Sequence, residues 1–112
     1  MAASRAAMTK YEVVMDDLKW LMEWYASQCN GDWEHSYGVK IDTLDNPGWS
    51  LTIDLEDTDL EERTFAPQEH DLMSDVSWWT CSVKNKKFEA RCGSRDLLTV
   101  LAIFRTWSEK PS

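Results

Sequence analysis

The first strong pattern in the chain is an amphipathic helix, which the spacing of apolar residues predicts over residues 10–28. Thr9 and Glu12 have the spacing of a capping box, and Asn30 followed by Gly31 supplies a stop signal. The apolar side chains that repeat at helical spacing define the face expected to pack on the core: Tyr11, Val14, Met15, Leu18, Leu21, Met22 and Tyr25.

Two tryptophans do not fit that face. Trp20 and Trp24 fall, with Val13, on nearly the opposite side of the predicted helix. A helix lying flat on a sheet would leave both indoles unburied, so either another segment of the chain covers them or a partner does. Trp33 and Tyr37, in the aromatic segment after the helix, are the candidates within the chain to fold over them.

Alternating apolar and polar residues then predict a β-hairpin. Residues 39–43 and 49–55 alternate in this way, and residues 45–48 between them read Asp-Asn-Pro-Gly, a strong turn sequence. Residues 56–74 carry no clear pattern. A short strand near residues 64–65, or one running to residue 72, is left open there.

A second hairpin and a closing helix follow. Residues 76–83 and 88–92 are predicted as its strands, joined by a turn at residues 85–86. Gly93 ends the last strand, and Ser94 is placed to cap a helix over residues 95–109. The apolar face of this helix is wide: Leu97, Val100, Leu101, Ile103, Phe104 and Trp107.

The order of these elements predicts the fold class. An N-terminal helix, a four- to five-stranded antiparallel sheet built of hairpins and a C-terminal helix make a two-layer α+β fold. The sequence has no internal repeat and no linker that would separate two domains. We therefore expect one domain over residues 9–110 and a disordered extension over residues 1–8, with Met8 as an alternative start.

Charge adds an asymmetry to this picture. The 112 residues carry a net charge of −8, yet residues 42–75 hold eleven acids and one base, a net of −10, so the remainder sums to +2. Six carboxylates lie within nine positions: Asp54, Glu56, Asp57, Asp59, Glu61 and Glu62. Such a field repels nucleic acid and anionic membranes and attracts a basic protein. The alternative is a solvated acidic loop that only keeps the protein in solution.

Motifs for catalysis, metals or cofactors are missing from the sequence. It has no phosphate-binding glycine loop, no GxSxG, HExxH or CxxC motif, and no ligands at metal spacing around His35 or His70. No metal and no cofactor are therefore expected. The catalytic alternative is a small hydrolase in which His35, oriented by Glu34 and helped by a nearby carboxylate, acts as a general base.

Compartment is suggested by the cysteines and by hydropathy. Cys29, Cys81 and Cys92 are odd in number and follow no secretory signal, which indicates reduced thiols in the cytoplasm. Cys81 and Cys92 lie on neighbouring predicted strands and fit small core residues. No apolar run approaches the roughly 20 residues needed to cross a bilayer.

Four stretches of the chain resemble the immunity protein 53 family. They read LKWLMEWY at residues 18–25, QCNGDWEH at 28–35, YGVKI at 37–41 and LDNPGWS at 44–50. A weaker similarity continues to Trp107. The family is known from bacterial polymorphic toxin systems, where a small protein encoded beside a toxin gene neutralises that toxin. The resemblance implies a cytosolic antitoxin that binds a cognate toxin without catalysis, and the acidity of the chain would suit a basic nuclease.

The candidate partner-binding surface combines aromatic and acidic residues, as protein–protein hot spots do. Asp32, Glu34 and His35 have no evident folding role and are the strongest candidates, whereas residues 46–49 are expected to build the turn and enter the core. The full candidate set is Trp20, Trp24, Asp32, Trp33, Glu34, His35, Asp54, Glu56, Asp57, Asp59, Glu61 and Glu62. The oligomeric state is left open.

Overall fold

The computed structural model describes residues 10–111, with side chains described from residue 16 onward. The elements are α1 (Lys10–Gln28), the single turn α2 (Trp33–Ser36), β1 (Val39–Leu44), β2 (Gly48–Asp54), β3 (Gln68–His70), β4 (Trp79–Lys84), β5 (Lys87–Cys92) and α3 (Leu97–Glu109). The predicted extension at residues 1–8 and the capping box at Thr9 lie outside the described residues, as do the side chains of Tyr11, Val14 and Met15.

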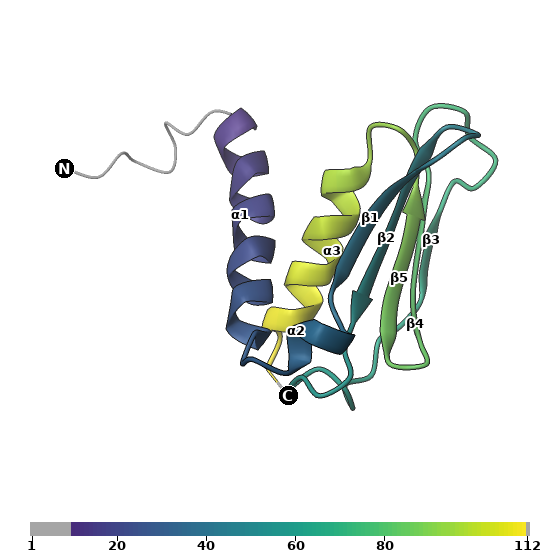
Figure 1. Cartoon of the computed structure of the whole chain (residues 1–112). Helices are drawn as coiled ribbons and strands as arrows, with labels where there is room; N and C mark the ends of the chain where they lie inside the picture. Colours follow the sequence, from purple (N-terminus) through teal and green to yellow (C-terminus); the bar gives the residue numbers. More distant parts are fainter. Residues whose placement is uncertain (1–9, 112) are drawn as a thin grey trace.

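The five strands form one antiparallel sheet in the order β1-β2-β5-β4-β3. Both predicted hairpins are present, and they meet along β2 and β5, where Leu51 lies opposite Ala90. Residues 55–67 carry the chain from β2 to the far edge, so β5 becomes a central strand. Figure 1 shows α1 and α3 on the same side of this sheet. The predicted α+β architecture is confirmed.

The sheet has one apolar and one polar face. Leu51 and Ile53 of β2 and Phe88 and Ala90 of β5 are buried on the side that carries the helices. The residues between them are half-buried and polar, as in the cross-strand row of Thr52, Glu89 and Ser82. This alternation follows from the two-residue period of a strand and leaves the second face open to solvent.

The predicted core face of α1 is wrong in part. Leu21 is buried, but Met22 and Tyr25 are 64% and 38% exposed. The two indoles that fell off the predicted face instead pack edge-to-face on Phe104 of α3, with ring centroids 5.8 Å away for Trp20 and 5.3 Å for Trp24. The reason is that α1 packs mainly beside α3 and not flat on the sheet, so the side of α1 that meets the core is rotated toward its tryptophans.

Phe104 is the centre of the core because both layers meet on it. Its ring lies 5.0 Å from that of Phe88 in β5, between the two indoles of α1 and the sheet. The buried residues of α3 are Val100, Leu101, Phe104 and Trp107, all within the predicted apolar face. Aromatic contacts of this edge-to-face kind add about 0.5–1.5 kcal/mol each beyond the area they bury.

Two boundaries differ from the prediction. The second hairpin begins at Trp79 and not at residue 76, because the backbone N–H of Trp78 donates to the Asp96 side chain (3.0 Å). The helix α3 begins at Leu97, with Asp96 and not Ser94 at its N-cap position. Asp96 is buried and also accepts a hydrogen bond from Ser77 (3.0 Å), so one carboxylate fixes the loop before β4 against the start of α3. The open strand in residues 56–74 is β3, within the longer of the two alternatives.

The three cysteines are free, and two belong to the core. Burial raises the pKa of Cys81 to about 12 and that of Cys92 to about 11, the latter with a further contribution from nearby Asp96. Both thiols therefore stay protonated and unreactive near neutral pH, as expected for small core residues. Among the described residues, no helix combines the length and the apolar character required to cross a bilayer.

Candidate functional site

Trp33 joins the short helix α2 to the acidic loop, which we define as residues 55–62 after β2. Its side chain is 4% exposed, and its indole N–H donates to the carbonyl of Glu56 (2.8 Å). Its ring meets Trp24 at 6.3 Å, Tyr25 at 6.0 Å and Tyr37 at 6.1 Å. Of the prediction that Trp33 and Tyr37 fold over Trp20 and Trp24, only the contact of Trp33 with Trp24 is confirmed. Trp20 packs on Phe104 instead, and Tyr37 contacts Trp33 itself. Trp33 is therefore a structural residue beneath the predicted surface and is not exposed on it.

Glu34 has a folding role that the sequence did not reveal. Its carboxylate accepts hydrogen bonds from the backbone N–H groups of Asn30 (3.0 Å) and Gly31 (2.8 Å). The Asn30 side chain in turn accepts from the N–H groups of Asp32 (3.0 Å) and Trp33 (2.9 Å). This reciprocal capping holds the turn between α1 and α2, in which Gly31 adopts a φ of +88°. Backbone hydrogen bonds, first from its own N–H and then from Asn30 and Gly31, lower the pKa of Glu34.

A pH dependence of stability follows from this capping. Because the pKa of Glu34 is lowered in the folded chain, its ionised form favours folding, fully at pH values above the ordinary carboxyl pKa of 4.5. That contribution disappears as the pH falls through the lowered folded pKa. We expect the free energy of unfolding of a Glu34→Gln variant to fall less steeply than that of wild type between about pH 7 and about pH 3 in urea titrations.

Glu69→Gln, at an exposed position on β3, is the matched control and should keep the slope of wild type. Parallel pH profiles for wild type and Glu34→Gln would contradict the capping role of Glu34.

Two carboxylates, one at the end of β2 and one in the acidic loop that follows, hold this loop in place. Asp54 accepts from the N–H of Gly38 (2.9 Å) and forms an ion pair with Lys87. Glu61 accepts from the N–H of Asp57 (2.7 Å), and that backbone bond, ahead of the Lys86 ammonium 3.6 Å away, lowers the pKa of Glu61. These two acids therefore stabilise the loop, and both are half-buried.

Residues 63–65 tie the same segment to the end of α3. The Arg63 guanidinium donates to the carbonyls of Trp107 (2.9 Å) and Lys110 (2.6 Å), where a helix C-terminus favours a cation. The Trp107 indole N–H donates to the carbonyl of Thr64 (2.8 Å). Phe65 packs against Trp107 with ring centroids 5.3 Å apart. The loop is thereby held between α2, β2 and α3.

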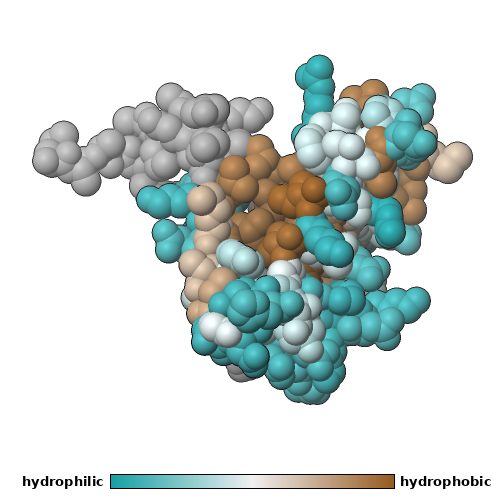
Figure 2. All heavy atoms as spheres, in the orientation of Figure 1, coloured by the Kyte–Doolittle hydropathy of each residue, from teal (hydrophilic) through white to brown (hydrophobic). Residues whose placement is uncertain are grey.

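These contacts bring two predicted groups together at one end of the molecule, which we call the acidic end. The acidic end consists of Asp32, Glu34, His35, Asp54, Glu56, Asp57, Asp59, Glu61 and Glu62. Asp32, Asp57, Asp59, Glu62 and His35 are exposed, whereas the other members are half-buried. In Figure 2 the lower part of the molecule, where α2 and this loop lie, presents an almost continuous hydrophilic surface.

Trp20 and Trp24 do not join the acidic end as surface residues. Both are half-buried against Phe104, and Trp20 also carries the Arg105 guanidinium 5.8 Å from its ring centroid. Arg105 in turn lies 3.1 Å from Asp17 and 3.5 Å from Asp16. The packing of α1 on α3 thus accounts for both indoles, and no partner is needed to cover them.

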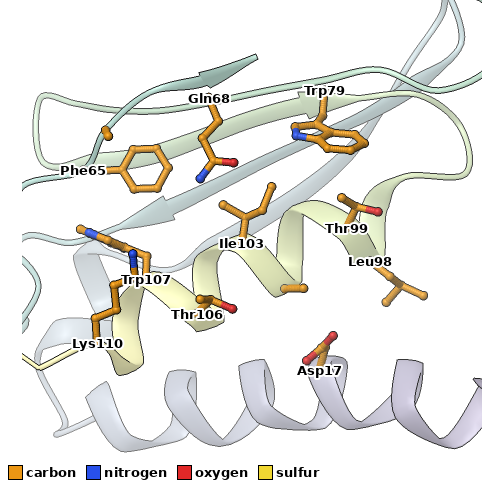
Figure 3. A pocket seen from close by; sticks show the side chains of 12 residues that line it. Asp17, Phe65, Gln68, Trp79, Leu98, Thr99, Ile103, Thr106, Trp107 and Lys110 are labelled. Atoms are coloured by element: carbon orange, nitrogen blue, oxygen red, sulfur yellow. The ribbon is translucent and has the colours of Figure 1, made fainter. Parts of the chain in front are cut away.

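A groove of about 580 Å³ opens between α3 and the strands β3 and β4 (Figure 3). Phe65, Gln68 and Trp79 project into it from the β3–β4 side, opposite Ile103 of α3. Asp17 borders it from α1 but is paired with Arg105. The groove is mainly apolar and brings no group of titratable side chains together. Its lining therefore suits contact with an apolar group and provides no acid–base chemistry.

Sequence patterning missed an exposed apolar patch at the end of the sheet opposite the acidic end. Leu72, Met73 and Val76 are 47%, 93% and 78% exposed. All three belong to the loop before β4, where Leu72 and Met73 line a cavity of about 510 Å³ together with Pro47 and Trp78. Leu72 and Met73 lie in the stretch for which no strand or helix period was found, where exposed apolar side chains are expected. Val76 was instead placed in a predicted strand that begins only at Trp79.

The catalytic alternative gains no support from this geometry. The Glu34 carboxylate is engaged by two backbone N–H groups, so it is not free to orient an imidazole, and His35 is exposed on α2. Among the described residues no group of three or more histidine, cysteine or acidic side chains is arranged to hold a metal ion.

Comparison with known proteins identifies the chain at the level of family. No curated protein and no solved structure gives a significant match. The family model described as immunity protein 53 matches residues 18–109, which span α1 from Leu18, the whole sheet and α3. The match covers most of the chain, including the α2 turn and the acidic loop, and the chain therefore belongs to the immunity protein 53 family.

Proposed function

We propose that this immunity protein neutralises a cognate bacterial toxin by binding it through the acidic end, without catalysis. The observation that carries the proposal is the attachment of α2 to the acidic loop by Trp33 and Glu56, which presents the carboxylates of two distant segments as one surface. Asp54 and Glu61 hold the loop in place. Asp57, Asp59 and Glu62 of the loop and Asp32 just before α2 remain exposed.

The chemistry of that surface suits a basic partner. A rigid array of carboxylates accelerates encounter with a positively charged protein and discriminates against other partners more than it raises affinity. Toxins that act on nucleic acid carry such basic surfaces, because their substrate is a polyanion. A basic nuclease of a polymorphic toxin system is the partner class we infer, and the three free cysteines are consistent with action in the cytoplasm.

Charge reversal at the acidic end tests this proposal. A variant with Asp32, Asp59 and Glu62 replaced by lysine should associate with the toxin about tenfold more slowly, or slower still, at low salt. Its association rate should also depend less on salt than that of wild type. The toxin is the protein encoded beside the gene, captured with this chain as bait, and the rate is measured by stopped flow or surface plasmon resonance.

The matched control reverses Asp45, Glu69 and Asp75, three exposed acids away from the acidic end, and changes the net charge by the same amount. It should slow association much less than the acidic-end variant. Equal losses in the two variants, or a wild-type rate that does not respond to salt, would place the toxin contact elsewhere.

A further inference from the structure

The outer edge of β1 is open and is bordered by apolar side chains. Within the described residues β1 pairs only with β2, so its other backbone edge has no neighbouring strand. Ile41 in β1 is 38% exposed, and Met22 and Tyr25 of α1 lie across a groove of about 320 Å³. Figure 2 shows hydrophobic surface between α1 and the sheet. A free strand edge beside exposed apolar residues is suited to pairing with another chain.

The alternation of hydrogen-bonded and non-hydrogen-bonded pairs along β1 decides which backbone N–H and C=O groups face the open edge. The Asp54 N–H donates to the Gly38 carbonyl (3.0 Å), so these two residues form a hydrogen-bonded pair in register with the ladder. Such pairs alternate along antiparallel strands, so the even-numbered residues of β1 direct their backbone groups to β2. The N–H and C=O groups of Val39, Ile41 and Thr43 therefore point outward.

The charges on β1 are complementary to β1 itself. Lys40 and Asp42 are exposed, flank Ile41 and lie on the polar face of the sheet. An antiparallel partner strand centred on Ile41 places Lys40 opposite Asp42 of a second copy, twice by symmetry. The same register sets Ile41 opposite Ile41 of the second copy, and Val39 opposite Thr43, with all outward backbone groups paired. Lys40 and Asp42 then occupy non-hydrogen-bonded positions, where facing side chains are closest.

We propose that two copies of this chain join through their β1 edges into one continuous antiparallel sheet. A two-fold axis through Ile41 and perpendicular to the sheet keeps the helices of both copies on one side, so the grooves lined by Met22 and Tyr25 face each other. A lysine on an edge strand ordinarily discourages pairing. Here the nearby Asp42 gives the edge a pair of opposite charges. A second copy of β1 therefore fits this edge better than a strand without this charge pattern does.

The dimer is compatible with, and independent of, toxin binding at the acidic end. Gly38 adjoins the acidic end through Asp54, and Thr43 lies toward the other end of β1. Because the paired strands run in opposite directions, the two acidic ends lie at opposite extremities. Their mutual repulsion is therefore small, and both stay exposed.

Sedimentation velocity of the full chain across the micromolar range tests the proposal. Wild type should show a concentration-dependent dimer. Lys40→Asp and Asp42→Lys should each weaken dimerisation about tenfold or more, because each converts two attractive cross-strand pairs into repulsive ones. An equimolar mixture of the two variants should dimerise again, since each acid on the β1 edge of the first variant then faces a base on the β1 edge of the second. This recovery also shows that both variants are folded.

Arg91→Glu, on the same polar face but in the central strand β5, is the control and should leave the dimer unchanged. A wild type that stays monomeric overturns the proposal. A dimer that both edge variants leave intact overturns it as well, because a different surface must then hold the copies together. A monomeric wild type whose toxin binding is weakened by the same variants would assign the edge to the toxin and also overturn it.

Discussion

Replacing Trp33 with alanine is expected to lower the free energy of unfolding by about 3–5 kcal/mol, a large part of the 5–15 kcal/mol typical of a domain. The indole is almost fully buried, meets three other aromatic rings and donates to the carbonyl of Glu56. Its loss leaves a cavity between α1, α2 and the acidic loop. Urea denaturation followed by far-ultraviolet circular dichroism measures the change.

Trp33→Phe separates the two contributions of this side chain. It keeps an aromatic ring in the cluster but removes the hydrogen bond to Glu56, and a bond of this kind contributes on the order of 1 kcal/mol. We expect a much smaller loss of stability than in Trp33→Ala, together with a weakened attachment of the loop. If Trp33→Ala lost less than about 1 kcal/mol, the cluster beneath the acidic end would not be packed as described.

Gly48→Ala is expected to destabilise the fold by on the order of 3 kcal/mol, since overpacking against a fixed backbone forces the strands apart. A Cβ at this position would lie 2.2 Å from the carbonyl oxygen of Cys92 in the neighbouring strand. That oxygen belongs to the backbone and cannot rotate away as a side chain would. Gly48 begins β2 at the point where β1, β2 and β5 lie side by side, so the change disturbs two ladders together.

The control for this change is Gly38→Ala. A Cβ at Gly38 meets no atom within 4 Å, and the backbone there does not have a positive φ. Its stability should stay within about 0.5 kcal/mol of wild type in the same urea titrations. Similar losses for the two variants would show that a general effect of replacing glycine dominates, and that close approach to Cys92 does not.

The two long helices and both hairpins were predictable because each is specified by local sequence. The turn at residues 45–48 and the alternation on either side of it fix the first hairpin without reference to the rest of the chain. The helix of residues 10–28 was predicted with the bounds that the structure has. Helical spacing also revealed that Trp20 and Trp24 share a side, although it did not show that this side meets α3.

The candidate site was predictable in composition but not in detail. Clustered acids identified the segment that forms most of the acidic end. Glu34 caps N–H groups only three and four residues before it, a local spacing that the sequence analysis did not use. Nothing local, by contrast, distinguished Asp54 from exposed acids such as Asp59. That distinction depends on which N–H groups face each side chain after folding, and the donor to Asp54 comes from Gly38, sixteen residues away in sequence.

By itself, therefore, the sequence determined the two long helices, the antiparallel pairing within both hairpins, the family and the concentration of negative charge, because each depends on neighbouring residues or on whole-segment composition. Only the tertiary structure decided the strand order with β5 at the centre, the rotation of α1 toward Phe104 and the joining of α2 to the acidic loop through Trp33. These features depend on contacts between distant segments, where several arrangements satisfy the same periodicity and packing selects one.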